Sequence, residues 1–288
     1  MEPVLRELID LLALERIEQN IFRGQSQDLG WGNVFGGQVL GQALSAAAQT
    51  VPAERAVHSL HGYFLRTGDA RQPIVYLVDP IRDGRSFTTR RVVAVQGGKA
   101  IFSLSASFQV SEEGLSHQDA MPDVKGPEGL KSEREWAKVI AEHLPKSLLA
   151  RVLADRPIEI RPVRPYNPLR PDERPPAHEV WFRVRDVLPD DTALHRYLLA
   201  YTSDFDFLVT ALMPHGRSWW TPGMQVASLD HAMWFHCPFR MDDWLLYVIE
   251  SPSASGARGL VRGRIFDRGG TLIATTAQEG LMREWPKE

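Results

Sequence analysis

The stretch that decides the fold is ALHRYLLAYTSDFDFLVTALM, residues 193–213. Its apolar residues recur at helical spacing, which predicts a long buried helix. Two aspartates, Asp204 and Asp206, stand near its centre. The neighbours of Asp204 on one helix face are apolar: Ala200, Tyr201, Phe207 and Leu208. The neighbours of Asp206 are mostly polar: Thr202, Ser203, Val209 and Thr210. Asp204 is therefore expected on the buried stripe, and Asp206 on a more polar side.

A buried carboxylate costs free energy unless it has hydrogen-bond partners. The pattern leaves two interpretations of Asp204 open. It is either a hydrogen-bonded structural carboxylate or a functional base whose pKa is raised by burial. For Asp206 we expect a solvated residue, or one that is bonded to a nearby hydroxyl.

The two halves of the chain resemble each other. The similar segments are IVYLVD (74–79) and LLYVIE (245–250), HGYFLR (61–66) and HAMWFH (231–236), and QGGKAIFS (96–103) and RGGTLIAT (268–275). The offset between the members of a pair stays between 170 and 172 positions. Three matches in the same order, with a nearly constant offset, indicate a duplicated domain.

Each half begins with an apolar helical stretch, 36–51 in the first half and 193–213 in the second, followed by strands rich in Val, Ile, Phe and Tyr. This order predicts an α+β fold in which an antiparallel sheet wraps around a central helix. We expect an N-terminal domain at 1–112, a polar, partly helical linker at 113–155 and a C-terminal domain at 156–288.

Composition and charge exclude several classes of protein. The net charge of −3 lacks the basic excess of a nucleic-acid-binding protein, so no nucleic-acid partner is expected. The single cysteine, Cys237, cannot form an intrachain disulfide, which favours a cytoplasmic protein. No apolar run approaches the roughly 18 residues of a membrane span, so none is expected. Leu5, Leu8 and Leu11 repeat at helical spacing and predict a docking helix at the N-terminus rather than a signal peptide.

The motifs of the common hydrolases are missing. The sequence contains no HExxH, no paired CxxC and no GxSxG, which argues against a zinc hydrolase and against a nucleophile-elbow serine hydrolase. No metal site is therefore expected. The adjacent Asp230 and His231 invite a catalytic dyad, but neighbours on a strand point to opposite faces, so we expect both to be structural.

Four segments carry a resemblance that runs nearly from end to end of the chain: FRGQSQDLGWGNVFGGQVLGQAL (22–44), HSLHGYFLRTGD (58–69), ASLDHAMWFHCPFR (227–240) and ATTAQEGLMR (274–283). In this order they resemble the acyl-CoA thioesterase II (TesB-type) family. The resemblance implies a double hotdog fold, made of two fused hotdog domains that lie side by side with their sheets joined. It also implies hydrolysis of medium- to long-chain fatty acyl-CoA to free acid and CoA, without a metal or an organic cofactor.

The resemblance further implies three catalytic residues. Asp204 in SDFDF matches an Asp on the second central helix of the family, Ser228 in ASLDH matches a Thr or Ser on a following strand, and Gln278 in TAQEG matches a Gln on the last strand. Bacterial members often carry Thr where this chain has Ser228. Together such side chains can activate and orient a water molecule for direct attack on the thioester.

Two further pairs of residues are candidates for binding the acyl-CoA substrate. Gly36 and Gly37 open the first helical stretch, where glycine serves either close packing or an anion or carbonyl site at the helix N-terminus. Arg258 and Arg262 lie among small residues in SPSASGARGLVRG (251–263). Their guanidinium groups are expected to meet either the phosphates of CoA or solvent.

Two alternatives remain open at the level of the sequence. The first is a hotdog enoyl-CoA hydratase or dehydratase. Those enzymes resemble one another in having an Asp followed five residues later by a His, and Val209 occupies that position here. The second is a non-catalytic acyl-CoA-binding protein of the same fold, which the matched Asp, Ser and Gln disfavour. We expect the chain to assemble as a homodimer or homotetramer.

Overall fold

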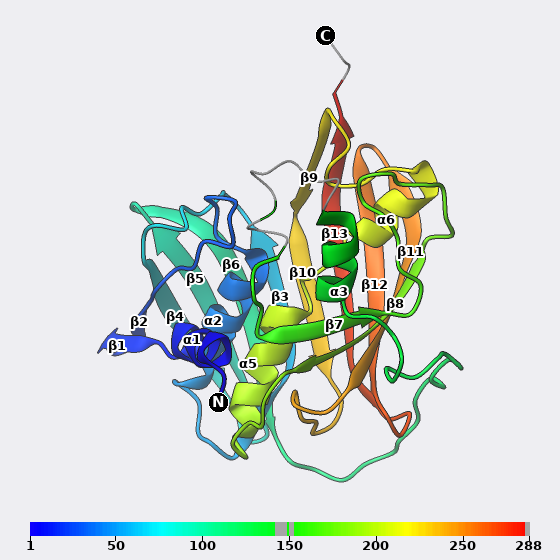
Figure 1. The fold of residues 1–288 in the computed structure, drawn as a ribbon. Helices are drawn as coiled ribbons and strands as arrows, with labels where there is room; N and C mark the ends of the chain where they lie inside the picture. The colour runs from blue at the N-terminus through cyan, green and yellow to red at the C-terminus, as the bar shows by residue number, and fades with distance from the viewer. Residues whose placement is uncertain (142–148, 150–152, 286–288) are drawn as a thin grey trace.

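The computed structural model describes residues 1–141, 149 and 153–285 (Figure 1). Within these residues the main element is one thirteen-stranded antiparallel sheet. The first half supplies β1 (Glu15–Glu18), β2 (Ile21–Gly24), β3 (Arg55–Phe64), β4 (Ile74–Asp83), β5 (Phe87–Gln96) and β6 (Lys99–Val110). The second half supplies β7 (Ile158–Pro162), β8 (Ala177–Val184), β9 (Met224–Ser228), β10 (Asp230–Phe235), β11 (Leu245–Ser255), β12 (Arg258–Asp267) and β13 (Leu272–Glu284).

The helical elements are few and are unequal in length. They are α1 (Pro3–Leu12), α2 (Gly36–Ala48), α3 (Glu133–Ile140), α5 (Thr192–Thr202), α6 (Val209–Leu212) and the 3-10 helix η2 (Met213–His215). The helix predicted over 36–51 is thus present as α2, and it ends three residues earlier than expected.

The two halves share the sheet edge to edge. The strands lie in the order β1-β2-β4-β5-β6-β3-β10-β13-β12-β11-β8-β7, and β9 also pairs with β13. β3 and β10 join the halves, with Leu60 opposite Met233 in the antiparallel register. The joined sheet that the family resemblance implied is therefore confirmed.

The similar segments of the sequence occupy equivalent places in this sheet. Counted outward from the β3–β10 junction, β4 is the fourth strand of the first half and β11 is the fourth strand of the second. These strands contain the matched segments 74–79 and 245–250. The segments 61–66 and 231–236 lie largely in the junction strands themselves. The strand order thus has the internal symmetry that a duplicated domain requires.

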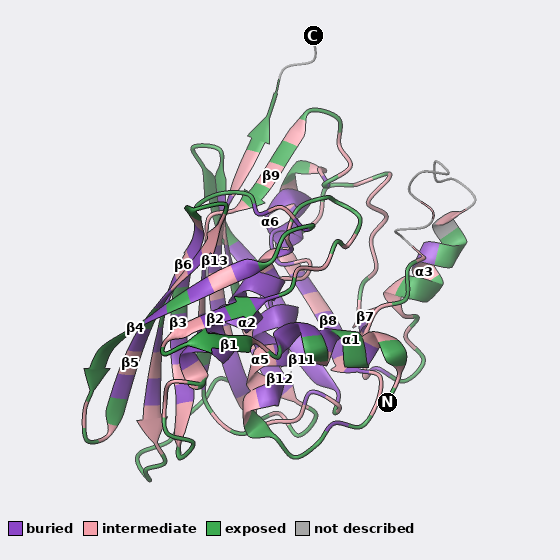
Figure 2. Ribbon diagram, turned by 90° about the vertical axis from the view of Figure 1, so that its left-hand side faces the viewer, coloured by how far each residue is buried: buried purple, intermediate pink, exposed green. Residues whose placement is uncertain are grey.

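The central helices α2 and α5 pack against each other in opposite directions, on the side of the sheet that curves around them (Figures 1 and 2). A Cβ atom on Gly37 would come within 2.1 Å of the carbonyl oxygen of Tyr201, and one on Gly41 within 3.1 Å of the carbonyl oxygen of Tyr197. Glycine is therefore required for so close an approach of the two backbones. The start of α2 consequently faces the end of α5, in the α+β arrangement expected from the sequence.

The prediction of one long helix over 193–213 is wrong in one respect. The helix is broken where the two aspartates lie. α5 ends at Thr202 and α6 begins at Val209. Between them Asp206 has a left-handed φ of 54°, which aspartate tolerates better than most residues. Helix spacing therefore does not apply across this segment, and the directions of the two carboxylates are set by the turn instead.

The remaining helices cover the core and one cavity. Leu5, Leu8, Leu11 and Leu12 of α1 are buried, which confirms the docking helix. Ser132 begins α3 with a capping box to Glu135. Residues 142–148 and 150–152 of the expected linker lie outside the described residues, and the division into domains stays a prediction. In the part of the chain that the structure describes, no helix is long and apolar enough to cross a membrane.

Candidate active site

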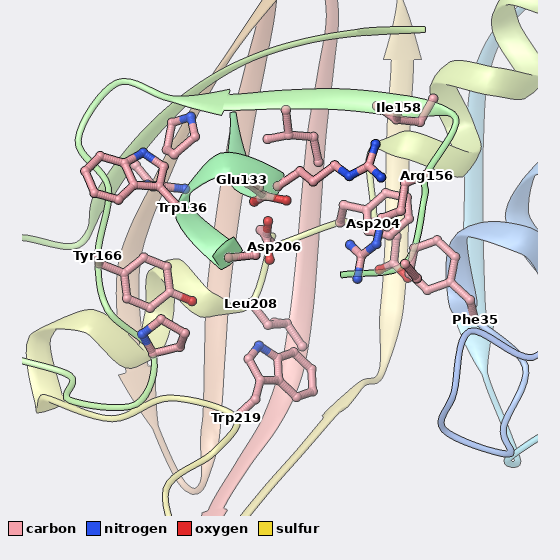
Figure 3. Close-up of a pocket in the computed structure, with 18 of the residues that line it drawn as sticks. Phe35, Glu133, Trp136, Arg156, Ile158, Tyr166, Asp204, Asp206, Leu208 and Trp219 are labelled. Atoms are coloured by element: carbon pink, nitrogen blue, oxygen red, sulfur yellow. The ribbon is translucent and has the colours of Figure 1, made fainter. Parts of the chain in front are cut away.

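A cavity of about 1260 Å³ lies where the two halves meet. Its wall combines residues 31 and 33–36 of the first half, 204–206, 208 and 219–220 of the second half, and part of α3. Much of this wall is aromatic, and it includes Phe35, Trp136, Tyr166 and Trp219 (Figure 3). The cavity is larger than the roughly 300–1,000 Å³ of most small-ligand sites. It is therefore large enough for an extended, mainly apolar ligand.

The structure brings the three predicted catalytic residues together at this cavity. Asp204, Ser228 and Gln278 all line it. The amide Nε2 of Gln278 donates a hydrogen bond of 2.7 Å to Ser228 Oγ. This contact follows from strand pairing, because β9 and β13 are neighbours and Ser228 lies opposite Gly280, two residues beyond Gln278. Side chains two residues apart on a strand share a face.

Asp204 lies against the N-terminus of α2. A Cβ atom on Gly36 would come within 2.5 Å of Asp204 Oδ2, so only glycine leaves room for the carboxylate. The backbone N–H of Gly37 hydrogen bonds to Asp204. No side chain caps α2, whose N-cap residue is Phe35. The carboxylate therefore takes the place of a capping side chain and accepts from the free end of the helix.

Burial raises the pKa of Asp204 to about 7, although hydrogen bonds from Gln278, Gly37 and Ser228 favour its ionised form. One carboxylate oxygen, Oδ1, is buried and has no hydrogen-bond partner among the described residues. A carboxylate with this pKa is partly ionised at neutral pH and is a much stronger base than an exposed aspartate. Of the two interpretations left open by the sequence, these surroundings favour the functional base.

Asp206 differs from the expectation. The sequence predicted a solvated or hydroxyl-bonded residue, but Asp206 lines the cavity and its carboxylate points toward that of Glu133 on α3 (Figure 3). Burial, followed by the charge of Asp206 and a hydrogen bond to it, raises the pKa of Glu133 well above its ordinary value. The cause of the error is the helix break, since the expected polar face of Asp206 existed only on a continuous helix.

His231 lies near the site, although the sequence did not predict that it takes part in it. The ring of His231 on β10 contacts Gln278 Oε1 through Nδ1 at 2.5 Å and Ser203 Oγ through Nε2 at 3.0 Å. Asp230 faces away, and its Oδ1 accepts from the backbone N–H of Glu279 at 2.6 Å. The rejection of an Asp230–His231 dyad is thus confirmed, but His231 belongs to the surroundings of the site.

The predicted substrate-binding residues separate into two groups. Gly36 lines the cavity, while the N–H of Gly37 is directed to Asp204. Arg258 and Arg262 lie on β12 and are exposed, and neither is part of the cavity wall. Arg258 forms an ion pair of 2.9 Å with Glu279. A contact between these arginines and CoA therefore stays a prediction.

The chemistry of the site depends on carboxylate, hydroxyl and amide groups. Among the described residues, no group of three or more His, Cys, Asp or Glu side chains is arranged to hold a metal ion. The groups that do converge can accept a proton from water and hold that water by hydrogen bonds. Such an arrangement is suited to hydrolysis.

Comparisons with known proteins agree with this geometry. A profile of the acyl-CoA thioesterase family matches residues 149–281, and a profile of the acyl-CoA thioesterase N-terminal domain matches residues 26–109. The chain is 46% identical to acyl-CoA thioesterase 2 of Haemophilus influenzae, over 98% of this chain and 99% of that protein.

Solved structures give the same result. The acyl-CoA thioesterase II TesB2 of Mycobacterium marinum is 45% identical, with a TM-score of 0.79 over 96% of this chain and 98% of that one. A protein with a hotdog fold from Alicyclobacillus acidocaldarius, only 21% identical, has a TM-score of 0.77 over 97% of this chain and 99% of that one, which supports the fold alone. The chain therefore belongs to the acyl-CoA thioesterase II family and is a hydrolase of acyl-CoA thioesters with a double hotdog fold.

Proposed function

We propose that this enzyme hydrolyses medium- to long-chain fatty acyl-CoA by direct attack of water, with Asp204 as general base and with Ser228 and Gln278 holding the water. The observation that carries the proposal is the convergence of these three side chains on one wall of the cavity. The raised pKa of Asp204, about 7, supports the role of a base at neutral pH.

The reaction follows from these groups. Asp204 accepts a proton from water while the water oxygen forms a bond to the thioester carbon. The C–S bond of the resulting tetrahedral intermediate then breaks, and the CoA sulfur takes the proton back from Asp204. The products are the free acid and CoA. Ser228 and Gln278 contribute by fixing the direction of the attacking lone pair, which removes part of the entropic cost of the reaction.

The acyl chain is assigned to the aromatic part of the cavity. Trp136, Tyr166 and Trp219 extend this wall away from Asp204 (Figure 3). Contact of the acyl chain with these rings removes apolar surface from water. This contributes a favourable free energy of about 25 cal/mol per Å² of buried apolar area. Acyl chains long enough to contact these rings bury more apolar surface than short acyl groups, which favours medium and long chains.

Assembly and location belong to the proposal as well. We expect a homodimer or homotetramer, because Tyr63 and Trp234 leave aromatic surface exposed on the junction strands β3 and β10. We also expect a cytoplasmic enzyme, in keeping with its single cysteine.

The test is release of free CoA from acyl-CoAs of graded chain length, with the purified wild-type protein. The proposal predicts the highest kcat/KM with medium or long chains, together with an equimolar yield of free acid. No release from any chain length would contradict the proposal. Hydration of an enoyl-CoA without release of CoA would support the hydratase alternative instead.

A further inference from the structure

His231 is part of a continuous line of hydrogen bonds that ends at the proposed catalytic residues. Ser203 Oγ lies 3.0 Å from His231 Nε2, His231 Nδ1 lies 2.5 Å from Gln278 Oε1, and Gln278 Nε2 lies 2.7 Å from Ser228 Oγ. The exposed fractions of Ser203, His231 and Gln278 are 0%, 0% and 1%. Bulk solvent therefore does not compete for the hydrogen bonds between Ser203, His231 and Gln278.

The register of the sheet places His231 beside Gln278. Ala232 on β10 lies opposite Ala277 on β13, so the next pair along the two antiparallel strands is His231 and Gln278. Cross-strand partners have side chains on the same face of the sheet. The amide of Gln278 thus lies between the imidazole on one side and Ser228 on the other.

The protonation of the ring decides which way the amide faces. Burial lowers the pKa of His231 to about 4, so the imidazole is neutral at neutral pH. A neutral imidazole has one donor nitrogen and one acceptor nitrogen. Because Gln278 Oε1 can only accept, Nδ1 must carry the proton and Nε2 must accept from the hydroxyl of Ser203.

Reversing the donors and acceptors along this line of hydrogen bonds would place a Gln278 oxygen against the carboxylate of Asp204. Ser203 Oγ also lies 3.0 Å from the carbonyl oxygen of Ala200, so its proton could go there while His231 Nε2 donates to Ser203. His231 Nδ1 would then be an acceptor and would draw the NH₂ group of Gln278 toward itself. Gln278 Oε1 would face Ser228 and Asp204, where an amide oxygen beside a carboxylate is repelled.

We propose that His231 is a positioning residue, which fixes the Gln278 amide with its NH₂ group toward Ser228 and Asp204. This inference rests on the proposed function, because it assigns His231 a role through Gln278. The NH₂ group then serves two purposes. It stabilises the ionised form of Asp204, and it leaves the hydroxyl proton of Ser228 free for the carboxylate or the attacking water.

The direct test is the tautomer of His231 in the wild-type enzyme, measured by nitrogen-15 NMR with labelled histidine. The inference predicts a neutral ring that is protonated at Nδ1 and unprotonated at Nε2 at pH 7. A ring protonated at Nε2 alone, or at both nitrogens, would overturn it. This measurement needs no variant, so it does not depend on whether a substituted protein folds.

The kinetic test uses His231→Leu and His231→Asn, each in the wild-type and in the Gln278→Ala background. His231→Leu removes the ring donor and should lower kcat about tenfold, with little change in KM. It should also move the acidic limb of the pH profile to higher pH, because a donor to Asp204 is no longer held in place. His231→Asn, whose amide N–H can take the position of Nδ1, should recover most of the loss.

The Gln278→Ala background separates positioning from a general packing role. If His231 acts through Gln278, then His231→Leu should change kcat by less than about twofold in that background. An equal loss in both backgrounds, or an unchanged pH limb in His231→Leu, would refute the inference. Ser203→Ala should change kcat and the acidic limb of the pH profile in the same direction but by less. It replaces His231→Leu in the test if that variant does not fold. Wild-type turnover of acyl-CoA reports on the proposed function separately.

Discussion

Gly36 and Asp204, at the ends of two central helices from different halves of the chain, are so close that a Cβ atom on Gly36 would lie 2.5 Å from Asp204 Oδ2. The same atom would lie 3.0 Å from the ring of Phe64. The first half thus contributes to the site without supplying an acid. It provides a helix N-terminus that holds the carboxylate of the second half.

We therefore predict that Gly36→Ala displaces Asp204 and lowers kcat/KM by at least about tenfold, since misplaced reacting groups are costly. The overlap should also reduce the free energy of unfolding by about 1–3 kcal/mol. Gly114→Ala is the matched control, because a Cβ atom there would meet no described atom within 4 Å. Steady-state kinetics and thermal unfolding of both variants check the prediction, which fails if the two behave alike.

The raised pKa of Asp204 predicts a pH-dependent effect on stability. Its folded value of about 7 lies above the unfolded value of about 3.9, so the folded state holds the proton more tightly. Ionisation of Asp204 therefore destabilises the fold progressively between about pH 4 and pH 7. Asp204→Asn should raise the melting temperature relative to wild type by several degrees at pH 8, and by less at pH 5. Equal differences at the two pH values would show that Asp204 is not buried as described.

Ser228 is predicted to hold water and not to attack the substrate. Its Oγ accepts a hydrogen bond from the Gln278 amide, no histidine among the described residues hydrogen bonds to it, and the neighbouring base Asp204 is assigned to the water. Ser228→Thr should stay active, while Ser228→Ala should lose about tenfold in kcat because the water is less well oriented. Rapid mixing should show no burst of CoA release, and intact-mass spectrometry should show no acyl adduct. An acyl group trapped on Ser228 would refute direct attack but not thioester hydrolysis.

The sequence predicted the parts of this molecule that depend on local pattern. The start of α2 at Gly36 and the equivalence of β4 and β11 were visible in glycine placement and in internal similarity. The break after Thr202 was not, because the residues that follow it contact the first half, where Asp204 lies against the N-terminus of α2. Helical spacing of apolar residues carries no information about such a partner.

The same reasoning explains why His231 was missed. Strand alternation correctly separated it from Asp230, but alternation does not tell which residue of another strand lies opposite. The pairing of His231 with Gln278 is fixed by the register between β10 and β13. These strands are separated by 36 residues of sequence, from the end of β10 at Phe235 to the start of β13 at Leu272. The position of Asp206 beside Glu133 likewise depends on α3, an element that the sequence placed only within a partly helical linker.

The most direct test of the account compares Asp204→Asn with Asp206→Asn on one long-chain acyl-CoA across pH 5–9. Both changes remove one carboxylate from the same cavity wall, but only Asp204 has Ser228 and Gln278 as partners. Wild type and Asp206→Asn should show kcat/KM that falls as the pH drops through about 7, with Asp206→Asn much less impaired. Asp204→Asn should lose about two orders of magnitude or more, and should lose that pH dependence. Equal losses in the two variants, or a larger loss in Asp206→Asn, would contradict the assignment of Asp204 as the base.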